Sequence, residues 1–447
     1  MCVRFSELDG ANIGVWGAGL EIGSFAAQLA RRLPGARIAV AAFDAPPAGD
    51  VLAALRAPDA RVVVGGDVLA ALAACDVVVR SPGVSSHRPE LRALRQSGVP
   101  VTTATALWLS ERGGRGVIGV TGTKGKSTTA ALAYHLARAA GCDVELAGNI
   151  GVPALDLLDR EPQLVVLELS SYQIADLGAG PQVALVTNLH REHIDWHGSE
   201  EAYRADKLRI LGLPGVRAVV LNGRDEALLA AGREHPAAIF YGVQSGWDVE
   251  REGIALNGRA IVVSGELPLR GEHNALNLCA ALAALEAAGV APPPLPAALG
   301  GFRPLPHRLE VVAERDGVLW VNDSISTTPE SALAALASFA DREVLLIGGG
   351  QDRGQDYTAL GRELAARGAS VIGLPSTGPR LLAAARSAGV GGARALEAPD
   401  LAAAVELART LVGAGGVVLL SPAAPSYDNY RNFEERGERF RALVASG

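Results

Sequence analysis

The residues with the clearest potential for chemistry lie in one glycine-rich segment, residues 119–129, with the sequence GVTGTKGKSTT. The segment follows an apolar run and leads into an alanine-rich helical pattern that ends near Ala140. A strand, a glycine turn and a helix N-terminus in that order bind anions, because backbone N–H groups point inward and the helix dipole favours negative charge. The pattern predicts a phosphate loop in which Lys126 reaches the terminal phosphates and Ser127 holds a magnesium ion. The general motif has glycine at position 120, where this chain has Val120, so an ordinary strand–turn–helix junction is the alternative.

Acidic and imidazole side chains accompany two later apolar runs. Glu168 interrupts the run at residues 164–169, and a buried carboxylate is costly unless a cation meets it. In a phosphate-binding domain that cation is expected to be magnesium, and pairing with a lysine is the alternative. The run at residues 183–188 leads into a segment with three histidines, His190, His193 and His197. Neither cysteine nor HExxH spacing supports zinc there, and a neutral imidazole beside Glu168 fits a second magnesium site better. Further on, the spacing around Lys207 by itself indicates a solvated surface lysine.

The side chains described above need β-sheets to hold them in place, and the sequence predicts several sheets. The first of these is predicted at the N-terminus. A strand at residues 12–16 is followed by Gly17-Ala18-Gly19 and a helix through Arg32, which is typical of a Rossmann-like unit of about a hundred residues. The third glycine comes one residue late for a dinucleotide fingerprint, so a tight turn without a ligand is the alternative. A second strand ends in Asp44, where an acidic group could meet a ribose hydroxyl, and a later one leads into Ser81-Pro82-Gly83.

The remaining chain predicts two further α/β domains. Residues 105–304 hold the phosphate loop, further strands, and a short β-rich insertion at residues 239–269. A proline cluster then precedes residues 305–447, where strands and helices alternate and polar residues follow the strands. We therefore expect an α/β fold of three domains: a Rossmann-like domain at residues 1–104, a central P-loop ATPase-type domain with a mixed sheet, and a C-terminal Rossmann-like domain.

Composition narrows the class of protein. Of the 447 residues, 49% are hydrophobic and 20% charged, which suits sizeable cores and excludes a disordered chain. The net charge of −7 without a basic block argues against nucleic-acid or anionic-membrane binding. The four cysteines show no CxxC spacing, which excludes a disulfide framework and a cysteine zinc site. With no signal-peptide pattern and no membrane-spanning run, we expect a cytoplasmic protein and a monomer.

Several ordered blocks of sequence make the chain resemble the Mur ligases, specifically the type that adds glutamate to UDP-N-acetylmuramoyl-L-alanine. The resemblance extends over essentially the whole chain. The matching blocks are residues 122–128, 148–151, 168–173, 271–277, 306–308, 322–324 and 432–437. The family's phosphate loop tolerates the valine that breaks the general motif.

The resemblance implies a reaction and a set of roles. The enzyme would be an ADP-forming acid–amino-acid ligase of peptidoglycan precursor synthesis, using ATP and two Mg²⁺ sites. The substrate carboxylate would attack the γ-phosphate, and the glutamate amine would displace the resulting acyl phosphate. Closure of the domains before chemistry would exclude water.

The resemblance also assigns roles to individual residues. The implied catalytic residues are Lys126, Glu168, His193 and Lys207, with Lys207 carried as a carbamate. The implied metal ligands are Ser127, Glu168, His193 and the Lys207 carbamate. The implied ATP contacts are Gly122, Thr123, Lys124, Gly125, Lys126, Ser127, Thr128, Asn274, Arg308 and Asp323. The implied contacts to the UDP-muramoyl substrate are Gly17, Gly19, Asp44, Ser81, Gly83, Asn149, Ser170, Gln173 and His193. The implied glutamate pocket contains Ile325, Thr327, Arg353, Ser426 and Phe433.

One departure bears on the amino acid. Members that add D-glutamate have a lysine where this chain has Ile325, whereas Arg353 can still clamp a carboxylate. The run from Ile325 to Pro329 resembles the subgroup that adds L-glutamate, whose product a separate epimerase later inverts. We favour L-glutamate, and D-glutamate with Ile325 as neutral drift is the alternative.

Three rival functions are weaker. A folylpolyglutamate synthetase-like ligase would begin at the phosphate-loop domain, whereas this chain has a separate N-terminal domain. A non-catalytic nucleotide-binding scaffold would not need the reactive residues that this chain keeps. Hydride transfer by the first domain lacks both the usual third glycine and a second-substrate site.

Overall fold

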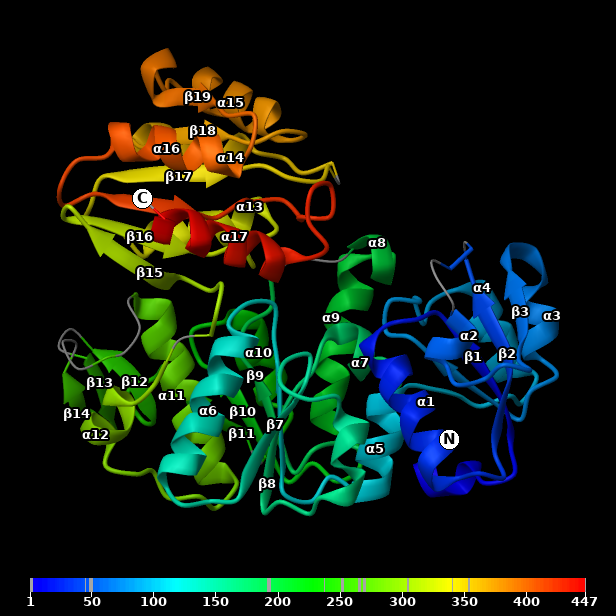
Figure 1. Ribbon diagram of the computed structural model, residues 1–447. Coiled ribbons are helices and arrows are strands. Elements are labelled where there is room, and N and C mark those ends of the chain that lie inside the picture. Colours follow the sequence, from blue (N-terminus) through cyan, green and yellow to red (C-terminus); the bar gives the residue numbers. More distant parts are fainter. Residues whose placement is uncertain are drawn as a thin grey trace. The chain divides into compact units, whose positions relative to one another are not determined.

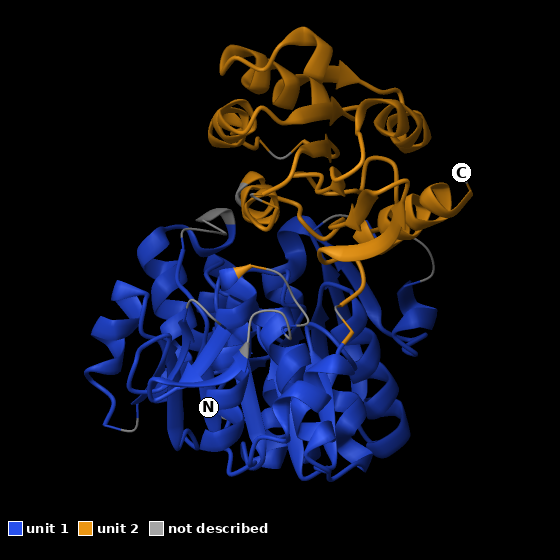
Figure 2. Cartoon of the chain, turned by 90° about the vertical axis from the view of Figure 1, so that its left-hand side faces the viewer, with its two compact units in different colours: residues 1–268, 272–302 blue, residues 269–271, 303–447 orange. Residues whose placement is uncertain are grey.

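The computed structural model describes residues 3–44, 46–47, 51–190, 194–236, 238–250, 253–263, 267, 271–303, 305–339, 341–352 and 354–446. The chain divides into two compact units, coloured separately in Figure 2. Unit 1 comprises residues 1–268 and 272–302, and unit 2 comprises residues 269–271 and 303–447. No helix among the described residues combines the length and apolarity needed to cross a membrane.

Unit 1 contains a five-stranded parallel sheet with the strand order β3-β2-β1-β4-β5 (Figure 1). Its strands are β1 (Asn12–Trp16), β2 (Arg37–Phe43), β3 (Arg61–Val64), β4 (Val77–Arg80) and β5 (Val101–Thr102). Its helices are α1 (Leu20–Arg32), α2 (Val51–Ala54), α3 (Val68–Leu72) and α4 (Pro89–Gln96). The predicted Rossmann-like unit is confirmed. The strand order reverses between β1 and β4, which is where open α/β sheets bind ligands.

A six-stranded sheet with the order β11-β10-β9-β6-β8-β7 forms the centre of unit 1, and its pairs are all parallel. Its strands are β6 (Val117–Thr121), β7 (Val144–Gly148), β8 (Leu164–Glu168), β9 (Val183–Val186), β10 (Ala218–Asn222) and β11 (Ala238–Tyr241). The accompanying helices are α5 (Ala104–Arg112), α6 (Lys126–Ala139), α7 (Ser171–Ile174), α8 (Ile194–His197), α9 (Glu200–Leu208), α10 (Glu226–Gly232), α11 (Glu272–Ala287) and α12 (Leu295–Gly300). Every residue of β6, β8 and β9 is buried, as expected for parallel strands covered on both faces.

A separate antiparallel sheet accounts for most of the predicted β-rich insertion. It consists of β12 (Trp247–Glu250), β13 (Gly253–Leu256) and β14 (Arg259–Val263). The insertion was predicted to start at Ile239, but this residue lies in β11, which pairs in parallel with β10. The mixed pairing predicted for the central domain is therefore divided between two sheets.

Contacts inside unit 1 join the N-terminal sheet to the central one. Ser24 in α1 donates a hydrogen bond to Asp156, with an Oγ–Oδ1 distance of 2.7 Å. Arg80, which is fully buried, forms an ion pair with Asp176 at 2.5 Å. These contacts explain why residues predicted to form two domains make up one compact unit. The predicted boundary at residues 104/105 falls at the start of α5 and stays a prediction.

Unit 2 contains a six-stranded sheet with the order β15-β16-β20-β17-β18-β19, in which only the β15–β16 pair is antiparallel among the described strands. Its strands are β15 (Glu310–Arg315), β16 (Val318–Asn322), β17 (Val344–Gly348), β18 (Ser370–Gly373), β19 (Ala395–Glu397) and β20 (Val417–Leu420). Its helices are α13 (Pro329–Ala337), α14 (Thr358–Ala366), α15 (Gly378–Ser387), α16 (Leu401–Leu411) and α17 (Phe433–Ser446). Two apolar clusters cover the two faces of this sheet, as alternate residues along β17 show.

Candidate active site

The predicted phosphate loop connects β6 to α6, and glycine is required at two of its positions. Gly122 and Gly125 have φ angles of 140° and 82°, which side-chain-bearing residues rarely adopt. A Cβ atom at Gly122 would also overlap Thr187 Oγ1, and one at Gly125 would overlap Asn277 Oδ1. Val120, which departs from the general motif, is a buried residue inside β6. The loop therefore begins after the position where the general motif has its first glycine.

The end of β9 holds the phosphate loop in place. Thr123 N donates to Asn188 O at 2.9 Å, and Lys124 N donates to Asn188 Oδ1 at 2.8 Å. Thr187 Oγ1 donates to Lys124 O at 2.6 Å. Lys126 is the first residue of α6, and its Nζ donates back to Thr123 O at 2.9 Å. The loop is thus held in shape by contacts from the neighbouring strand, and a lysine lies over it.

Glu168 is the last residue of β8 and lies beside β6, the strand that leads into the loop. Its side chain is buried, and no described residue offers a hydrogen bond to its Oε2 atom. An orphaned, buried carboxylate oxygen is costly, so this atom fits a cation ligand better than a structural role. The neighbouring Asn149 donates its backbone N–H to Glu168 O at 3.1 Å and has an exposed side chain.

Lys207 comes from α9, whose N-terminus is capped by Ser199 accepting from Ala202 N at 3.1 Å. The lysine is only 2% exposed, so its interpretation as a solvated surface residue is wrong. Its Nζ donates to Gly122 O at 3.0 Å and lies 5.0 Å from the ring of Tyr203. Tyr203 in turn contacts Thr123 Oγ1 at 2.6 Å. Helix α9 therefore brings a buried cation to the phosphate loop.

The N-terminus of α11 packs against the same loop. Asn277 Oδ1 accepts a hydrogen bond from Thr129 Oγ1 at 3.2 Å, and Asn277 Nδ2 donates to Asn274 Oδ1 at 3.3 Å. Asn274, a predicted ATP contact, is thus placed close to the loop, and Ser127 and Thr128 are buried at the start of α6. Sequence reasoning did not select Asn277, although it lies in the same sequence block as Asn274.

The predicted substrate residues of the N-terminal sheet meet at the ends of β1, β2 and β4. A Cβ atom at Gly17 would approach Ser81 Cβ to 2.9 Å, and Ser81 Oγ donates to Ala18 O at 3.0 Å. Asp44 accepts from Trp16 Nε1 at 3.3 Å and forms an ion pair with Arg88 at 2.7 Å. Gly19 and Gly83 lie in the same two loops, and Gly19 precedes α1 with a φ of 129°.

The same edge of the sheet carries further residues that no sequence motif singled out. Leu20 is 86% exposed at the start of α1, and Arg88 stacks over Trp16 at 4.7 Å. An exposed leucine and a cation beside glycine loops suit a base and a phosphate. A Cβ atom added at Gly23, the late third glycine, would have no atom within 4 Å. Gly23 therefore does not provide the close helix–strand packing that the third glycine of a dinucleotide site provides.

Gln173 and Ser170, also predicted substrate residues, form a capping box at the start of α7. Gln173 is fully buried and its Nε2 donates to Glu21 Oε1 at 2.5 Å, while Thr105 Oγ1 donates to Glu21 Oε2 at 3.1 Å. Burial raises the pKa of the Glu21 carboxyl, and the hydrogen bonds from Gln173 and Thr105 oppose that rise. Gln173 therefore joins α7 to α1, and its predicted substrate contact stays a prediction.

The candidate site in unit 2 lies in three loops that follow β16, β17 and β20, which are neighbours in the sheet. We call them the strand-end loops: residues 323–328, 349–352 and 421–432. Arg436, which is 1% exposed, joins two of them. Its guanidinium donates to Ser324 Oγ at 3.0 Å, to Ser324 O at 2.9 Å and to Ala424 O at 3.2 Å. Burial lowers the pKa of Arg436 to about 10.

The predicted glutamate-pocket residues of unit 2 that the structure describes lie in the strand-end loops or directly after them. Ile325 and Thr327 are half-buried in the first strand-end loop, and Ser426 is buried in the third. Phe433 is held by Ser324 Oγ, which donates to the Phe433 carbonyl oxygen at 2.7 Å. Gln351, in the second loop, has a buried Oε1 atom to which no described residue donates. An amide oxygen in this position suits the amine of an incoming amino acid, and sequence reasoning did not select Gln351 or Arg436.

Asp323 is the first residue of the first strand-end loop. Its side chain is fully buried, accepting from Leu309 N at 3.1 Å and from Ser421 Oγ at 2.8 Å. Burial raises its pKa to about 6, against the lowering effect of hydrogen bonds and of the Arg308 charge. Two other predicted residues, His193 and Arg353, lie outside the described residues.

Two family models match the chain. A family model described as "Mur ligase middle domain" matches residues 120–285, and one described as "Mur ligase, glutamate ligase domain" matches residues 307–424. A protein of a Micromonospora species named UDP-N-acetylmuramoyl-L-alanine--L-glutamate ligase is 43% identical, covering 99% of this chain and 98% of its own length. A protein of the same name from Xanthomonas campestris pv. campestris is 41% identical, covering 99% of this chain and 97% of its own length.

A solved structure has the same fold. The MurF ligase of Thermotoga maritima in complex with ADP aligns with a TM-score of 0.59 and 17% identity. The alignment covers 100% of this chain and 99% of that one. The likeness confirms the predicted three-part α/β architecture.

Proposed function

Because the chain belongs to the Mur ligase family, we propose that it uses ATP to join L-glutamate to UDP-N-acetylmuramoyl-L-alanine. The names of the two relatives support both the acceptor and the L-enantiomer, and the ADP in the solved relative supports nucleotide use. The observation that carries the proposal is the orphaned Glu168 carboxylate together with buried Lys207 at a glycine loop. A non-catalytic scaffold would not bury both charges at that loop.

Phosphoryl transfer between two anions needs alignment and charge neutralisation more than covalent help. Lys126, released from Thr123 O, would bind the β- and γ-phosphates, and the N-terminus of α6 would face the anion. The substrate carboxylate then attacks the γ-phosphate and ADP leaves. The glutamate amine attacks the resulting acyl phosphate at carbon, phosphate leaves, and an amide remains.

Ser127 and Glu168 would hold Mg²⁺, which supplies charge neutralisation between the carboxylate and the triphosphate. His193 and the Lys207 carbamate would complete a second Mg²⁺ site. The orphaned oxygen of Glu168 fits this ligand set. The UDP group would lie at the ends of β1, β2 and β4, and the glutamate would bind at the strand-end loops. Arg308 and Asp323 would contact the nucleotide.

The composition of the chain supports a special role for Lys207. The chain has only three lysines, Lys124, Lys126 and Lys207, although Lys and Arg together number 41. The chain therefore uses arginine for nearly all of its permanent positive charges. A lysine amine adds CO₂ to give a carbamate, whereas a guanidinium stays charged. The Lys207 ammonium now donates to Gly122 O, so the anionic carbamate would have to turn away from that carbonyl.

A paired coupling assay tests the proposal. The full chain receives UDP-N-acetylmuramoyl-L-alanine, ATP and Mg²⁺ with either L- or D-glutamate, and the nucleotide product is weighed. We expect coupling of L-glutamate. Coupling of D-glutamate alone would show that Ile325 is a neutral substitution. If neither enantiomer of glutamate is coupled, the amino-acid assignment is overturned.

Variants of Lys207 test the carbamate. We expect Lys207→Ala and Lys207→Arg to abolish amide formation, because neither can provide a carbamate anion. Added short carboxylates should partly restore amide formation by Lys207→Ala. Arg204→Ala, in the same helix and 43% exposed at the side chain, is the matched control and should stay active. Full activity of Lys207→Arg would refute the carbamate.

A further inference from the structure

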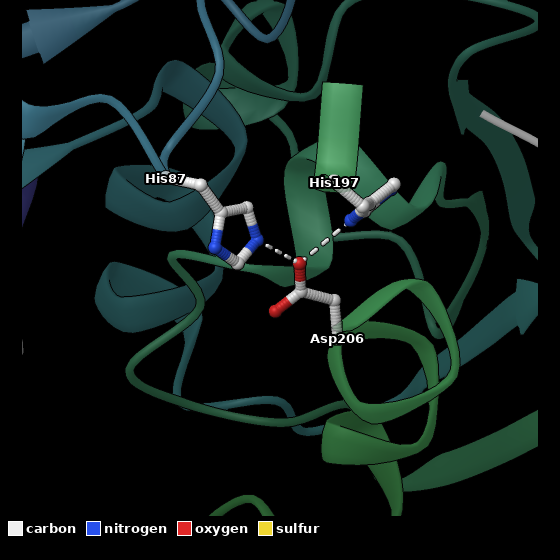
Figure 3. Close-up of side chains that lie close together, drawn as sticks. All are labelled: His87, His197 and Asp206. Carbon is white, nitrogen blue, oxygen red and sulfur yellow. Dashed lines mark hydrogen bonds and ion pairs between the residues drawn. The ribbon is translucent and has the colours of Figure 1, made fainter. Parts of the chain in front are cut away.

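Two histidines and an aspartate converge outside the phosphate loop (Figure 3). His87 comes from the loop after β4, His197 is the last residue of α8, and Asp206 lies in α9. The Oδ2 atom of Asp206 lies 2.6 Å from His87 Nε2 and 2.8 Å from His197 Nδ1. The three candidate ligand atoms all lie within 4.8 Å of one another.

The three side chains differ in exposure in a way that leaves one side open. The His197 side chain is fully buried, that of Asp206 is 15% exposed, and that of His87 is 35% exposed. A buried imidazole, a partly covered carboxylate and a more exposed imidazole give solvent access from the His87 side. Zinc-type sites with three protein ligands characteristically keep a fourth position open to water.

The partner of His197 on its other ring nitrogen supports metal binding. Ser171 Oγ lies 2.9 Å from His197 Nε2. Without a metal, Nδ1–H donates to Asp206 and Nε2 accepts from the serine; when a metal replaces the Nδ1 proton, Nε2 takes the ring proton and donates to Ser171. Such an outer hydrogen bond fixes the tautomer of metal-binding histidines in general.

The cluster is separate from the phosphate loop even though Asp206 and Lys207 are neighbours in sequence. Adjacent residues on a helix do not face each other. Lys207 accordingly reaches Gly122 O, whereas Asp206 reaches the two imidazoles. The ligand chemistry differs as well, because two imidazoles with one carboxylate suit Zn²⁺, Co²⁺ or Ni²⁺, whereas the ligands proposed for Mg²⁺ are oxygens with a single imidazole.

We propose that His87, His197 and Asp206 bind one divalent transition-metal ion of the Zn²⁺ class, which ties the loop after β4 to α9. Bonds of about 2.0–2.2 Å in a tetrahedral shell set the ligand atoms roughly 3.3 Å apart. The present separations from Asp206 Oδ2 are shorter, so the carboxylate withdraws by a fraction of an ångström when the ion enters. Rotation of the partly exposed Asp206 side chain provides this movement. His197 belongs to the three-histidine segment that lacks a zinc motif; the fold adds Asp206 from the next helix and His87 from a distant part of the chain.

The test uses the full chain, freed of metal by a chelator and kept in a large excess of Mg²⁺ to occupy oxygen-ligand sites. Zn²⁺ binding is measured by calorimetry, and Co²⁺ binding by its visible absorption. Trp196 provides a third readout, because its ring lies 4.4 Å from that of His197 and a bound Co²⁺ should quench its fluorescence. We expect one equivalent of either ion to bind.

His87→Gln and Asp206→Asn each remove one ligand with little change of shape, so we expect Zn²⁺ affinity to fall about a hundredfold or more. His235→Gln, which changes a histidine after α10, is the matched control and should bind as the unaltered chain does. Circular dichroism of each variant verifies folding. Absence of saturable binding, or binding that survives in both ligand variants, would overturn the proposal and identify the cluster as a hydrogen-bonded contact only.

Discussion

The phosphate loop of unit 1 and the strand-end loops of unit 2 both lie where parallel strands end, but they are held together differently. The phosphate loop is one continuous segment whose shape depends on Gly122 and Gly125 and on contacts from β9. The strand-end loops come from three distant parts of the chain, and the buried guanidinium of Arg436 joins two of them. Backbone geometry forms the first site, and a buried cation assembles the second. The two sites should therefore fail under different substitutions.

The largest effect is expected from Gly122→Ala. The new methyl group would overlap Thr187 Oγ1 and force alanine to a φ of 140°. We expect unfolding to become easier by at least about 3 kcal/mol, and ATP-dependent coupling to be lost. Urea unfolding and the coupling assay measure these effects.

Gly141→Ala is the matched control, because Gly141 also has a positive φ, 81°, but nothing lies within 4 Å of a built Cβ. It should cost only about 1 kcal/mol of stability and leave coupling intact. Equal losses in the two variants would show that φ alone, and not contact with β9, governs the loop.

A pH effect of similar size is expected from Asp323→Asn in unit 2. The folded-state pKa of Asp323 is about 6, raised by burial from 3.8, so folding favours its protonated form. Its stabilising contribution is present below pH 4 and is lost as the pH rises through 6, by about 3 kcal/mol. Asparagine does not titrate, so the stability of Asp323→Asn relative to the unaltered chain should rise by that amount between pH 4 and pH 7.

Denaturant unfolding at several pH values measures this difference, and other carboxylates cancel in the comparison. Asp341→Asn, an exposed position in the same unit, is the matched control for the substitution itself. A pH-independent difference for Asp323→Asn would contradict the raised pKa.

A smaller effect is expected from Arg436→Gln. Glutamine cannot reach both Ser324 O and Ala424 O, so buried carbonyl groups lose their donors. We expect a loss of about 2 kcal/mol in unfolding free energy and a raised KM for glutamate, with ATP binding unchanged. Arg439→Gln, an exposed residue of the same helix, should change stability by less than about 0.5 kcal/mol. Weakened ATP binding in Arg436→Gln would contradict the separation of the two sites.

The smallest effect concerns the choice of glutamate enantiomer. Ile325→Lys places a cation at a half-buried position among the strand-end loops. It should draw the amino-acid carboxylate toward position 325 and lower the L/D ratio of kcat/KM by about tenfold, or 1.4 kcal/mol. Val311→Lys adds the same charge at an exposed position of β15 and should leave the ratio unchanged. An unaltered L/D ratio in Ile325→Lys would show that residue 325 does not set the preference for one enantiomer.

Much of the fold could be predicted because it follows from local patterns. Buried parallel strands appear as apolar runs, and β1 occupies the predicted residues. The phosphate loop was recognisable for the same reason, since its glycines, lysine and serine are adjacent in sequence. The start of the β-rich insertion was predicted wrongly. The local sequence around Ile239 suits an edge strand of either sheet, and only the pairing of β11 with β10 assigns it to the central sheet.

Local sequence patterns did not reveal residues that act through distant partners, although the family resemblance had named Lys207. Lys207 lies on a helix with ordinary surface spacing, and only the packing of α9 against the phosphate loop reveals its burial. One signal was nevertheless available, because the chain has only three lysines and two of them lie in the phosphate loop. Arg436 lay within a recognised block, but its role depends on loops more than ten residues away in sequence.

The amino-acid sequence by itself determined the order of strands and helices and the phosphate-loop chemistry, because hydrophobic periodicity, glycine conformation and helix termini act within a few residues. Only the tertiary structure decided which charges are buried and which side chains meet. In the folded chain, no described residue donates to Glu168 Oε2, Lys207 Nζ donates to Gly122 O, and His87 lies against Asp206. These features depend on dehydration and on approach between distant segments, which the pairing of sheets and the packing of helices impose and no local pattern encodes.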